Sequence, residues 1–315
     1  MRTLFRGALH GAGAADSVLV EGEVITWVGR GDPPSRPDEE VVAAPGEIIA
    51  PGFIDLQVNG YAGHDAAAGA DSIAALSDAL PATGVTAFLP TLISAPVEVG
   101  ADFAATVGAA SEAQGARVLG AHIEGPFLNP SFRGAHLRAH LAEPTPENVD
   151  VIEAARPRLV TLAPELPGAL AAAERLHRSG IVAPAAFDEQ LLRVKGGGRV
   201  ALTTDQTSAA GAPPGTYALS GRPVVSDGRV VRLKDGTLAG SAASMPDLVR
   251  LMARLPGMSL SRAISLASAV PARVLGERGL GRIAEGACAD LVVMDVEMRI
   301  RLTMIRGVVK FRQPS

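Results

Sequence analysis

The middle of the chain alternates short apolar segments with alanine-rich segments, and this alternation restricts the possible folds more than any other feature. The apolar segments predict strands at residues 52–58, 85–90, 118–124, 159–164, 181–183 and 200–205. The segments between them predict helices at residues 71–82, 96–114, 146–156, 169–179 and 185–195. Nearly continuous apolar strands that alternate with helices are typical of a parallel sheet buried on both faces. We therefore predict an α/β core with six parallel strands.

The rest of the chain has a different pattern. Its predicted elements are hairpins at residues 17–29 and 222–240, helices at 245–254 and 259–275, and strands at 290–295 and 305–311. Both ends of the chain are therefore rich in short strands and turns. We expect these two ends to pair with each other in one small sheet domain.

The composition excludes several classes of protein. The net charge is −4 and there is no run of Lys or Arg, so nucleic acid is not an expected partner. The single cysteine, Cys288, excludes an internal disulfide and a cysteine-rich zinc site. The first ten residues lack the apolar core of a signal peptide, and the longest uncharged stretch, residues 79–97, contains three prolines. We expect a cytoplasmic protein without a membrane partner.

Two carboxylates stand at the ends of predicted strands. Glu124 lies in His122-Ile-Glu124-Gly125-Pro126, where an apolar strand breaks, and Asp205 ends the last predicted strand. The C-terminal ends of parallel barrel strands carry active-site residues, which favours a site at Glu124. Asp205 alone is compatible with a helix N-cap or an Asx-turn, but together with Glu124 it favours a site.

A stripe of polar residues runs along one face of the first predicted strand. Asp55, Gln57 and Asn59 occupy alternate positions, so their side chains share one face of the strand. Buried polar groups need hydrogen-bond partners. The stripe is equally compatible with a hydrogen-bonded strand end and with the wall of a site.

The histidines do not supply an evident metal site. A metal-dependent hydrolase would need two or more histidines between Glu124 and Asp205, and those present do not end an apolar strand: His136, His140 and His177. His136 and His64 are compatible with a ligand contact or with an exposed loop. We expect His140 at the surface and His177 as a positive charge at a helix C-terminus.

Several segments together resemble the N-acetylglucosamine-6-phosphate deacetylases of the amidohydrolase superfamily. The matching segments are residues 51–60, 84–92, 122–129, 133–136, 161–165, 202–206, 236–241 and 280–295. His122-Ile-Glu124-Gly125-Pro126 and Thr161-Leu-Ala-Pro-Glu165 are the motifs specific to the deacetylases. The match covers nearly the whole chain, in the family's order.

The resemblance implies a (β/α) barrel with a small β-sandwich built from both chain ends. We accordingly expect residues 1–49 as the first part of the sandwich, residues 50–282 as the barrel domain, and residues 283–315 as the second part. It also implies one divalent metal ion, zinc or iron, since Gln57 and Asn59 stand where relatives with a second metal carry histidines. An amino-sugar phosphate substrate and a homodimer are likewise implied.

The resemblance assigns roles residue by residue. Glu124 matches the metal-binding glutamate of the third strand. Asp205 matches the acid/base that takes a proton from water and passes it to the leaving amine. The residues that match the sugar contacts of the family are Ala135, His136, Leu238, Ala239 and Gly240.

One departure from the family is large. Directly after Val182, the chain resembles the segment that precedes the family's last strand, so two strand–helix units of roughly 30 residues each are missing. Both metal-binding histidines and the phosphate-binding arginine would lie in those units. We therefore expect a barrel truncated to about six strands, with doubtful metal retention and open sheet edges that a dimer would cover.

Three functions follow in order of preference. The first is hydrolysis of N-acetylglucosamine 6-phosphate to glucosamine 6-phosphate and acetate, impaired by the missing histidines. The alternative is a non-catalytic sugar-phosphate binder or a remnant homologue. Another amidohydrolase activity ranks last, because the bridging lysine such enzymes often use on strand four is not present in residues 159–164.

Overall fold

The computed structural model describes residues 1–183 and 200–314. Its central sheet is parallel and contains β7 (Phe53–Val58), β10 (Val85–Ile93), β11 (Arg117–Val118), β12 (His122–Glu124) and β13 (Leu159–Thr161). β10 lies in the middle, with β7 on one side and β11 and β12 on the other, and β13 pairs with β12. Four of the predicted strand regions are therefore confirmed as neighbours in one parallel sheet.

The two remaining predicted strands are not regular strands. Val182 forms one parallel bridge with Leu159, and Gln206 forms one with Val58, at opposite sides of the sheet. Residues 203–205 are instead fixed by side chains, because Thr203 and Thr204 donate hydrogen bonds to Asp55. The predicted strand at 200–205 is therefore wrong, and the predicted helix at 185–195 lies outside the described residues.

Helices cover the sheet. The helices that follow β7, β10, β12 and β13 are α1 (Ala70–Ala79), α2 (Val97–Ala109), α3 (Pro146–Ala155) and α4 (Ala169–Arg178). α1 and α2 pack their apolar sides into the largest core cluster, against Phe53 and Phe88, whereas α3 and α4 pack on Ile123 and Val160. The prediction of a helix through residue 114 was too long, since the chain turns after Ala109 and Gly115 passes against Ser77.

The C-terminal helices show a further correction. α6 (Met245–Met252) begins with a capping box formed by Ser244 and Asp247. The single helix predicted at 259–275 is two helices, α7 (Leu260–Leu266) and α8 (Ala269–Leu275). Ser268 between them has non-helical dihedral angles, and Pro271 has no N–H with which to continue a helical hydrogen-bond ladder.

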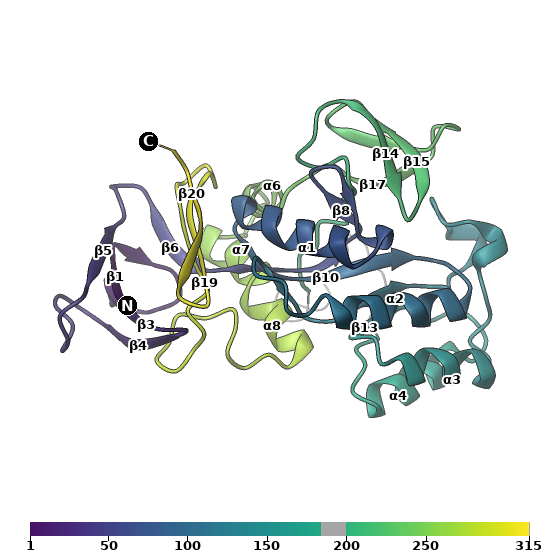
Figure 1. The fold of residues 1–315 in the computed structure, drawn as a ribbon, viewed down its shortest axis with the longest axis horizontal. Coiled ribbons are helices and arrows are strands. Elements are labelled where there is room, and N and C mark those ends of the chain that lie inside the picture. The colour runs from purple at the N-terminus through teal and green to yellow at the C-terminus, as the bar shows by residue number, and fades with distance from the viewer. Residues whose placement is uncertain (184–199, 315) are drawn as a thin grey trace.

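A small antiparallel sheet stands at the carboxyl end of the central strands. It contains β14 (Gly215–Leu219), β15 (Arg222–Ser226), β16 (Val230–Arg232) and β17 (Leu238–Ser241) in sequential order. The predicted hairpin at 222–240 is confirmed and extended by β14. Figure 1 shows this sheet near β8 (Gly60–Tyr61), which pairs with β9 (His64–Asp65).

The two chain ends form two further sheets, seen together at the left of Figure 1. One contains β1 (Arg2–Arg6), β3 (Ser17–Glu21), β4 (Val24–Gly29) and β5 (Glu39–Val42). The other joins both ends and contains β2 (Ala8–Leu9), β6 (Ile48–Pro51), β18 (Leu291–Met294), β19 (Ile300–Ile305) and β20 (Val308–Arg312). Residues of both sheets share one apolar cluster, which includes Phe5, Ile49 and Leu291. Among the described residues, no helix is both long and apolar enough to cross a membrane.

Candidate active site

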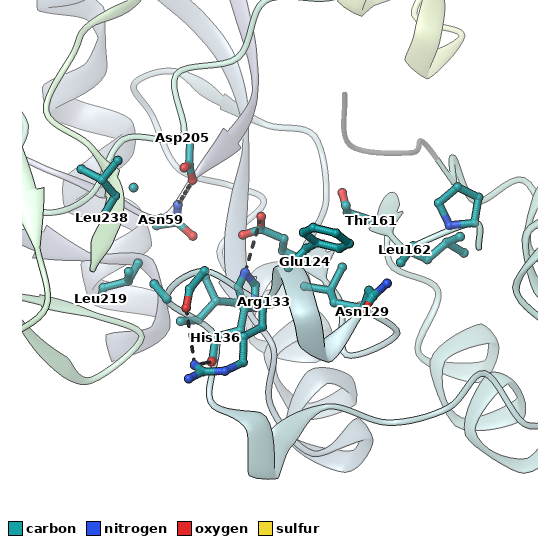
Figure 2. A pocket seen from close by; sticks show the side chains of 18 of the residues that line it. Asn59, Glu124, Asn129, Arg133, His136, Thr161, Leu162, Asp205, Leu219 and Leu238 are labelled. Atoms are coloured by element: carbon teal, nitrogen blue, oxygen red, sulfur yellow. Dashed lines mark hydrogen bonds and ion pairs between the residues drawn. The ribbon is translucent and has the colours of Figure 1, made fainter. Parts of the chain in front are cut away.

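A cavity of about 600 Å³ opens at the carboxyl ends of the central strands, where Glu124 and Asp205 both line it. Figure 2 shows Asp205 and Glu124 in the upper part of the view, with Arg133 and His136 below them. Enzyme sites on parallel sheets lie at this end of the strands. The structure therefore brings together the two acids that the sequence singled out.

Asp205 is held by the two amides of the polar stripe. Gln57 Nε2 and Asn59 Nδ2 both donate to Asp205 Oδ1, each at 2.9 Å. Burial and the negative charge of Glu124 raise the pKa of Asp205 to about 8. A carboxyl group with this pKa can accept and donate a proton near neutral pH.

Glu124 is the last residue of β12, and its pKa is shifted in the opposite direction. Its Oε1 lies 3.7 Å from His136 Nε2, which is an electrostatic contact rather than a hydrogen bond. Burial acts to raise the pKa of Glu124, but His136, His122 and Gln57 together outweigh burial, and the pKa lies below its usual value. The neighbours of the two acids thus push their pKa values apart, as in sites that use one carboxyl as an acid and another as an anion.

The orientation of His136 follows from its contacts with Ser94. The Ser94 backbone N–H donates to His136 Nδ1 at 3.1 Å, and Ser94 Oγ lies 2.8 Å from the same nitrogen. Because Nδ1 accepts a hydrogen bond, we assign the ring N–H to Nε2, the nitrogen that faces Glu124. Sequence reasoning missed Ser94, and only its position after the long apolar strand could have signalled it.

The His122 ring is hydrogen-bonded to two threonines rather than to Glu124. Its ring is buried, with Nδ1 3.2 Å from Thr91 Oγ1 and Nε2 2.9 Å from Thr161 Oγ1. Burial lowers the pKa of His122 to about 4, so the ring is neutral at physiological pH. Both ring nitrogens are therefore hydrogen-bonded to threonine hydroxyls beneath the site.

The other candidate residues are placed as follows. Ala135, His136, Leu238 and Gly240 line the cavity, whereas Ala239 is fully buried in the cluster behind β17. His140 Nδ1 donates to Ser94 O, and the side chains of His64 and His177 are exposed. The cavity also receives residues that sequence reasoning did not select, namely Asn129, Phe132, Arg133 and Glu165. Arg133 and Glu165 belonged to recognised motifs, and that was the available signal.

The described side chains do not fit the metal centre that the motifs imply. In residues 1–183 and 200–314, no three His, Cys, Asp or Glu side chains form a group that could hold a metal ion. The proton on His136 Nε2 occupies the position from which that ring would bind a metal beside Glu124. Zinc sites use three or four protein ligands, so Glu124 alone is a poor one.

Comparison with known proteins assigns the family. Residues 194–310 match the model of the Amidohydrolase family. The chain is 31% identical over 330 residues to the N-acetylgalactosamine-6-phosphate deacetylase of Escherichia coli O157:H7. That alignment covers 83% of this chain and 87% of the Escherichia coli protein. The chain belongs to the N-acetylglucosamine-6-phosphate deacetylase family of amidohydrolases. The N-acetylglucosamine-6-phosphate deacetylase of Bos taurus is another relative, 30% identical with 83% of each chain covered.

Solved structures of the family agree with the fold. A mutant N-acetyl-D-glucosamine-6-phosphate deacetylase from Mycobacterium smegmatis, solved with N-acetyl-D-glucosamine-6-phosphate, has a TM-score of 0.87 at 25% identity. That match covers 98% of this chain and 99% of the mycobacterial chain. The resemblance seen in the motifs is therefore confirmed, as is an amidohydrolase fold with an α/β core. Members of the amidohydrolase family generally depend on divalent metal ions.

Proposed function

We propose that this protein hydrolyses the acetamide of N-acetylglucosamine 6-phosphate, giving glucosamine 6-phosphate and acetate. The observation that carries the proposal is the pair Glu124 and Asp205, which face one cavity with pKa values shifted in opposite directions. The relatives named above are deacetylases of amino-sugar 6-phosphates, which favours catalysis over a role in binding alone.

The proposed reaction adds water to the acetamide carbonyl. The water oxygen forms a bond to the carbonyl carbon, and ionised Asp205 takes the proton that the water releases. The carbon–nitrogen bond then breaks, and Asp205 returns the proton to the leaving amine nitrogen. Both amides bind Asp205 Oδ1, which leaves Oδ2 to carry the proton.

The cavity walls are proposed to bind the sugar. The cavity has the volume of a typical small-molecule site, and Ala135, His136, Leu238 and Gly240 are among the residues that line it. His136 Nε2–H can donate to a sugar or acetamide oxygen without losing its Ser94 contact. Ala239 would contribute through its backbone, since its side chain is buried.

We also propose that Glu124 is the attachment point for one zinc or iron ion and that this chain holds the ion weakly. The missing donors described above are the reason. After loading with Zn²⁺ and dialysis, we expect well under one ion per chain by elemental analysis. Stoichiometric zinc that survives dialysis would contradict this expectation and would point to ligands outside the described residues.

The shortened barrel is part of the proposal. The alignment with the Escherichia coli relative spans 330 residues, yet 83% of this 315-residue chain is about 260, roughly 70 residues fewer. That deficit is close to two strand–helix units of a barrel, at roughly 30 residues each. We propose a barrel domain at residues 50–282 with six strand positions, and a sandwich from residues 1–49 and 283–315. A homodimer would cover the open edges of the shortened sheet.

The test is release of acetate from N-acetylglucosamine 6-phosphate by the full-length protein, supplied with Zn²⁺ or Fe²⁺. Asp205→Asn should reduce the rate by about 100-fold or more, because an amide cannot accept the proton. Asp78→Asn is a matched control, since Asp78 is an exposed residue of α1, and its rate should be unchanged. Absence of acetate release from the metal-supplied wild type, or full activity of Asp205→Asn, would overturn the proposal.

A further inference from the structure

Asp55 is a buried carboxylate that lies beneath the site without lining the cavity. Its side chain has no exposed surface. Oδ1 accepts from Thr203 Oγ1 at 2.8 Å and from the Thr204 and Gln57 backbone N–H groups, both at 3.2 Å. Oδ2 accepts from Thr204 Oγ1 at 2.6 Å. Burial raises the pKa of the Asp55 carboxyl, and the Thr204 and Thr203 hydrogen bonds oppose that rise. Such a concentration of polar contacts within a core needs a reason beyond the packing of β7.

The segment that Asp55 binds ends at the proposed acid/base in an unusual conformation. Asp205 has a φ of +51°, in the left-handed region that non-glycine residues seldom occupy. Residues of this kind persist where the surrounding structure holds them. The contacts that hold Asp205 in this conformation therefore determine the geometry of the site.

Contacts on both sides of Asp205 determine its position. On its N-terminal side, Thr203 and Thr204 are bound to Asp55. On its C-terminal side, the Gln206 N–H donates to Thr204 Oγ1 at 3.2 Å, and Gln206 O accepts from the Asn59 N–H at 2.9 Å. Thr204 Oγ1 thus links Asp55 to both flanks of Asp205.

We infer that Asp55 is a positioning residue that holds the segment Thr203–Gln206 so that the Asp205 carboxyl faces the cavity that Glu124 also lines. This inference deepens the proposed function, since Asp205 is the proton-transfer group of that reaction. It also accounts for the whole polar stripe of Asp55, Gln57 and Asn59. Asp55 holds the backbone beside Asp205, while Gln57 and Asn59 hold its carboxyl group.

The first experiment compares kcat and KM for acetate release in Asp55→Ala and Asp55→Asn. Asp55→Ala removes the clamp, and kcat should fall by about 100-fold with little change in KM, because the reacting carboxyl is displaced. Asp55→Asn keeps an oxygen for Thr203 and the two N–H groups, and its NH₂ can donate to Thr204 Oγ1, so most of the kcat should return. Wild-type kcat in Asp55→Ala, or equal losses in the two variants, would overturn the inference.

Asp290→Ala is the matched control for loss of a buried aspartate. Asp290 is 4% exposed and is bound to Arg117 between the end sheets and the central sheet, away from the cavity. This variant should lose stability but keep its kcat. A fall in kcat as large as that of Asp55→Ala would show that general destabilisation explains the effect.

A second experiment does not depend on activity. Urea unfolding of Asp55→Ala, Asp205→Gly and the double variant forms a double-mutant cycle. Glycine adopts the left-handed conformation freely and has no carboxyl to hold, so Asp55→Ala should shift the midpoint less when it is combined with Asp205→Gly. Additive shifts would overturn the inference, and the cycle of Asp290→Ala with Asp205→Gly should be additive. If wild-type protein releases no acetate, the proposed function fails and the cycle alone decides the role of Asp55.

Discussion

At the scale of single residues, the neighbours of each titratable group decide its behaviour. Glu124 faces the His136 ring, whereas Asp205 receives two amide N–H groups and faces the charge of Glu124. His122 lies two residues before Glu124 in the same strand, yet it contacts two threonine hydroxyls. His122 and Glu124 therefore differ in their surroundings although they belong to one motif, and only the structure shows this difference.

The burial of His122 predicts a stability effect of pH. In the unfolded chain the pKa is the ordinary 6.5, and in the folded protein it is about 4, so the unfolded state binds more protons between these values. The contribution is present in full above pH 6.5 and is lost as the pH falls to about 4. At about 1.4 kcal/mol per unit, the loss is about 3 kcal/mol.

The measurement is urea unfolding with a chelator from pH 7.5 to 4, for the wild type and His122→Gln. The difference in free energy of unfolding between the two proteins should shrink by about 3 kcal/mol over this range, because glutamine does not titrate there. His177→Gln is the control, since His177 is exposed on α4. Parallel curves for the wild type and His122→Gln would contradict the prediction.

At the scale of elements, the alternation of apolar and alanine-rich segments predicted the location of the central strands and their helices. It predicted the ends of α3 and α4 to within one residue but did not predict the end of α2. α2 stops at Ala109 because the following chain must reach Ser77, whose O accepts from the Ala116 N–H and whose Oγ accepts from the Gly115 N–H. Such a contact joins residues far apart in sequence and leaves little local signal.

Two glycines of this region should respond oppositely to alanine. A Cβ at Gly115 would lie 2.0 Å from the backbone O of Ser77, so Gly115→Ala should lower the free energy of unfolding by about 1–3 kcal/mol. Gly108 lies in α2 with nothing within 4 Å of its Cβ position, so Gly108→Ala should raise it by about 0.5–1 kcal/mol. Chemical denaturation of both variants checks the pair, and a Gly115→Ala protein as stable as the wild type would refute the clash.

At the scale of the whole molecule, an ion pair ties the chain ends to the central sheet. Arg117 of β11 binds both carboxylate oxygens of Asp290, with distances of 2.8 and 3.0 Å. The same carboxylate accepts the Arg306 N–H at 2.8 Å. The pair is nearly buried, so solvent screens it weakly.

Loss of this pair should destabilise the protein strongly. Arg117→Met leaves the Asp290 carboxylate without its charged partner, and the free energy of unfolding should fall by about 3 kcal/mol. Arg250→Met is the control, because Arg250 and Asp247 form a pair that is 44% exposed on each side, and it should cost at most about 1 kcal/mol. Equal effects of the two substitutions in thermal and urea unfolding would show that burial does not matter here.

The sequence by itself determined the family and the parallel α/β core, and it singled out Glu124 and Asp205 as candidate site residues. These features depend on local patterns and on residue identity, which a single chain displays directly. The polar stripe of Asp55, Gln57 and Asn59 was visible too, although its purpose was not.

Only the tertiary structure decided how those residues are used. Asp205 has a left-handed backbone conformation rather than ending a strand, and Asp55 binds the preceding Thr203 and Thr204 from a strand about 150 positions earlier. The His122 ring contacts two threonines and the His136 ring contacts Glu124, because the orientation of each ring depends on residues from other segments of the chain. Hydrogen bonds between distant residues carry no periodic signal, and they are what positions the chemistry of this protein.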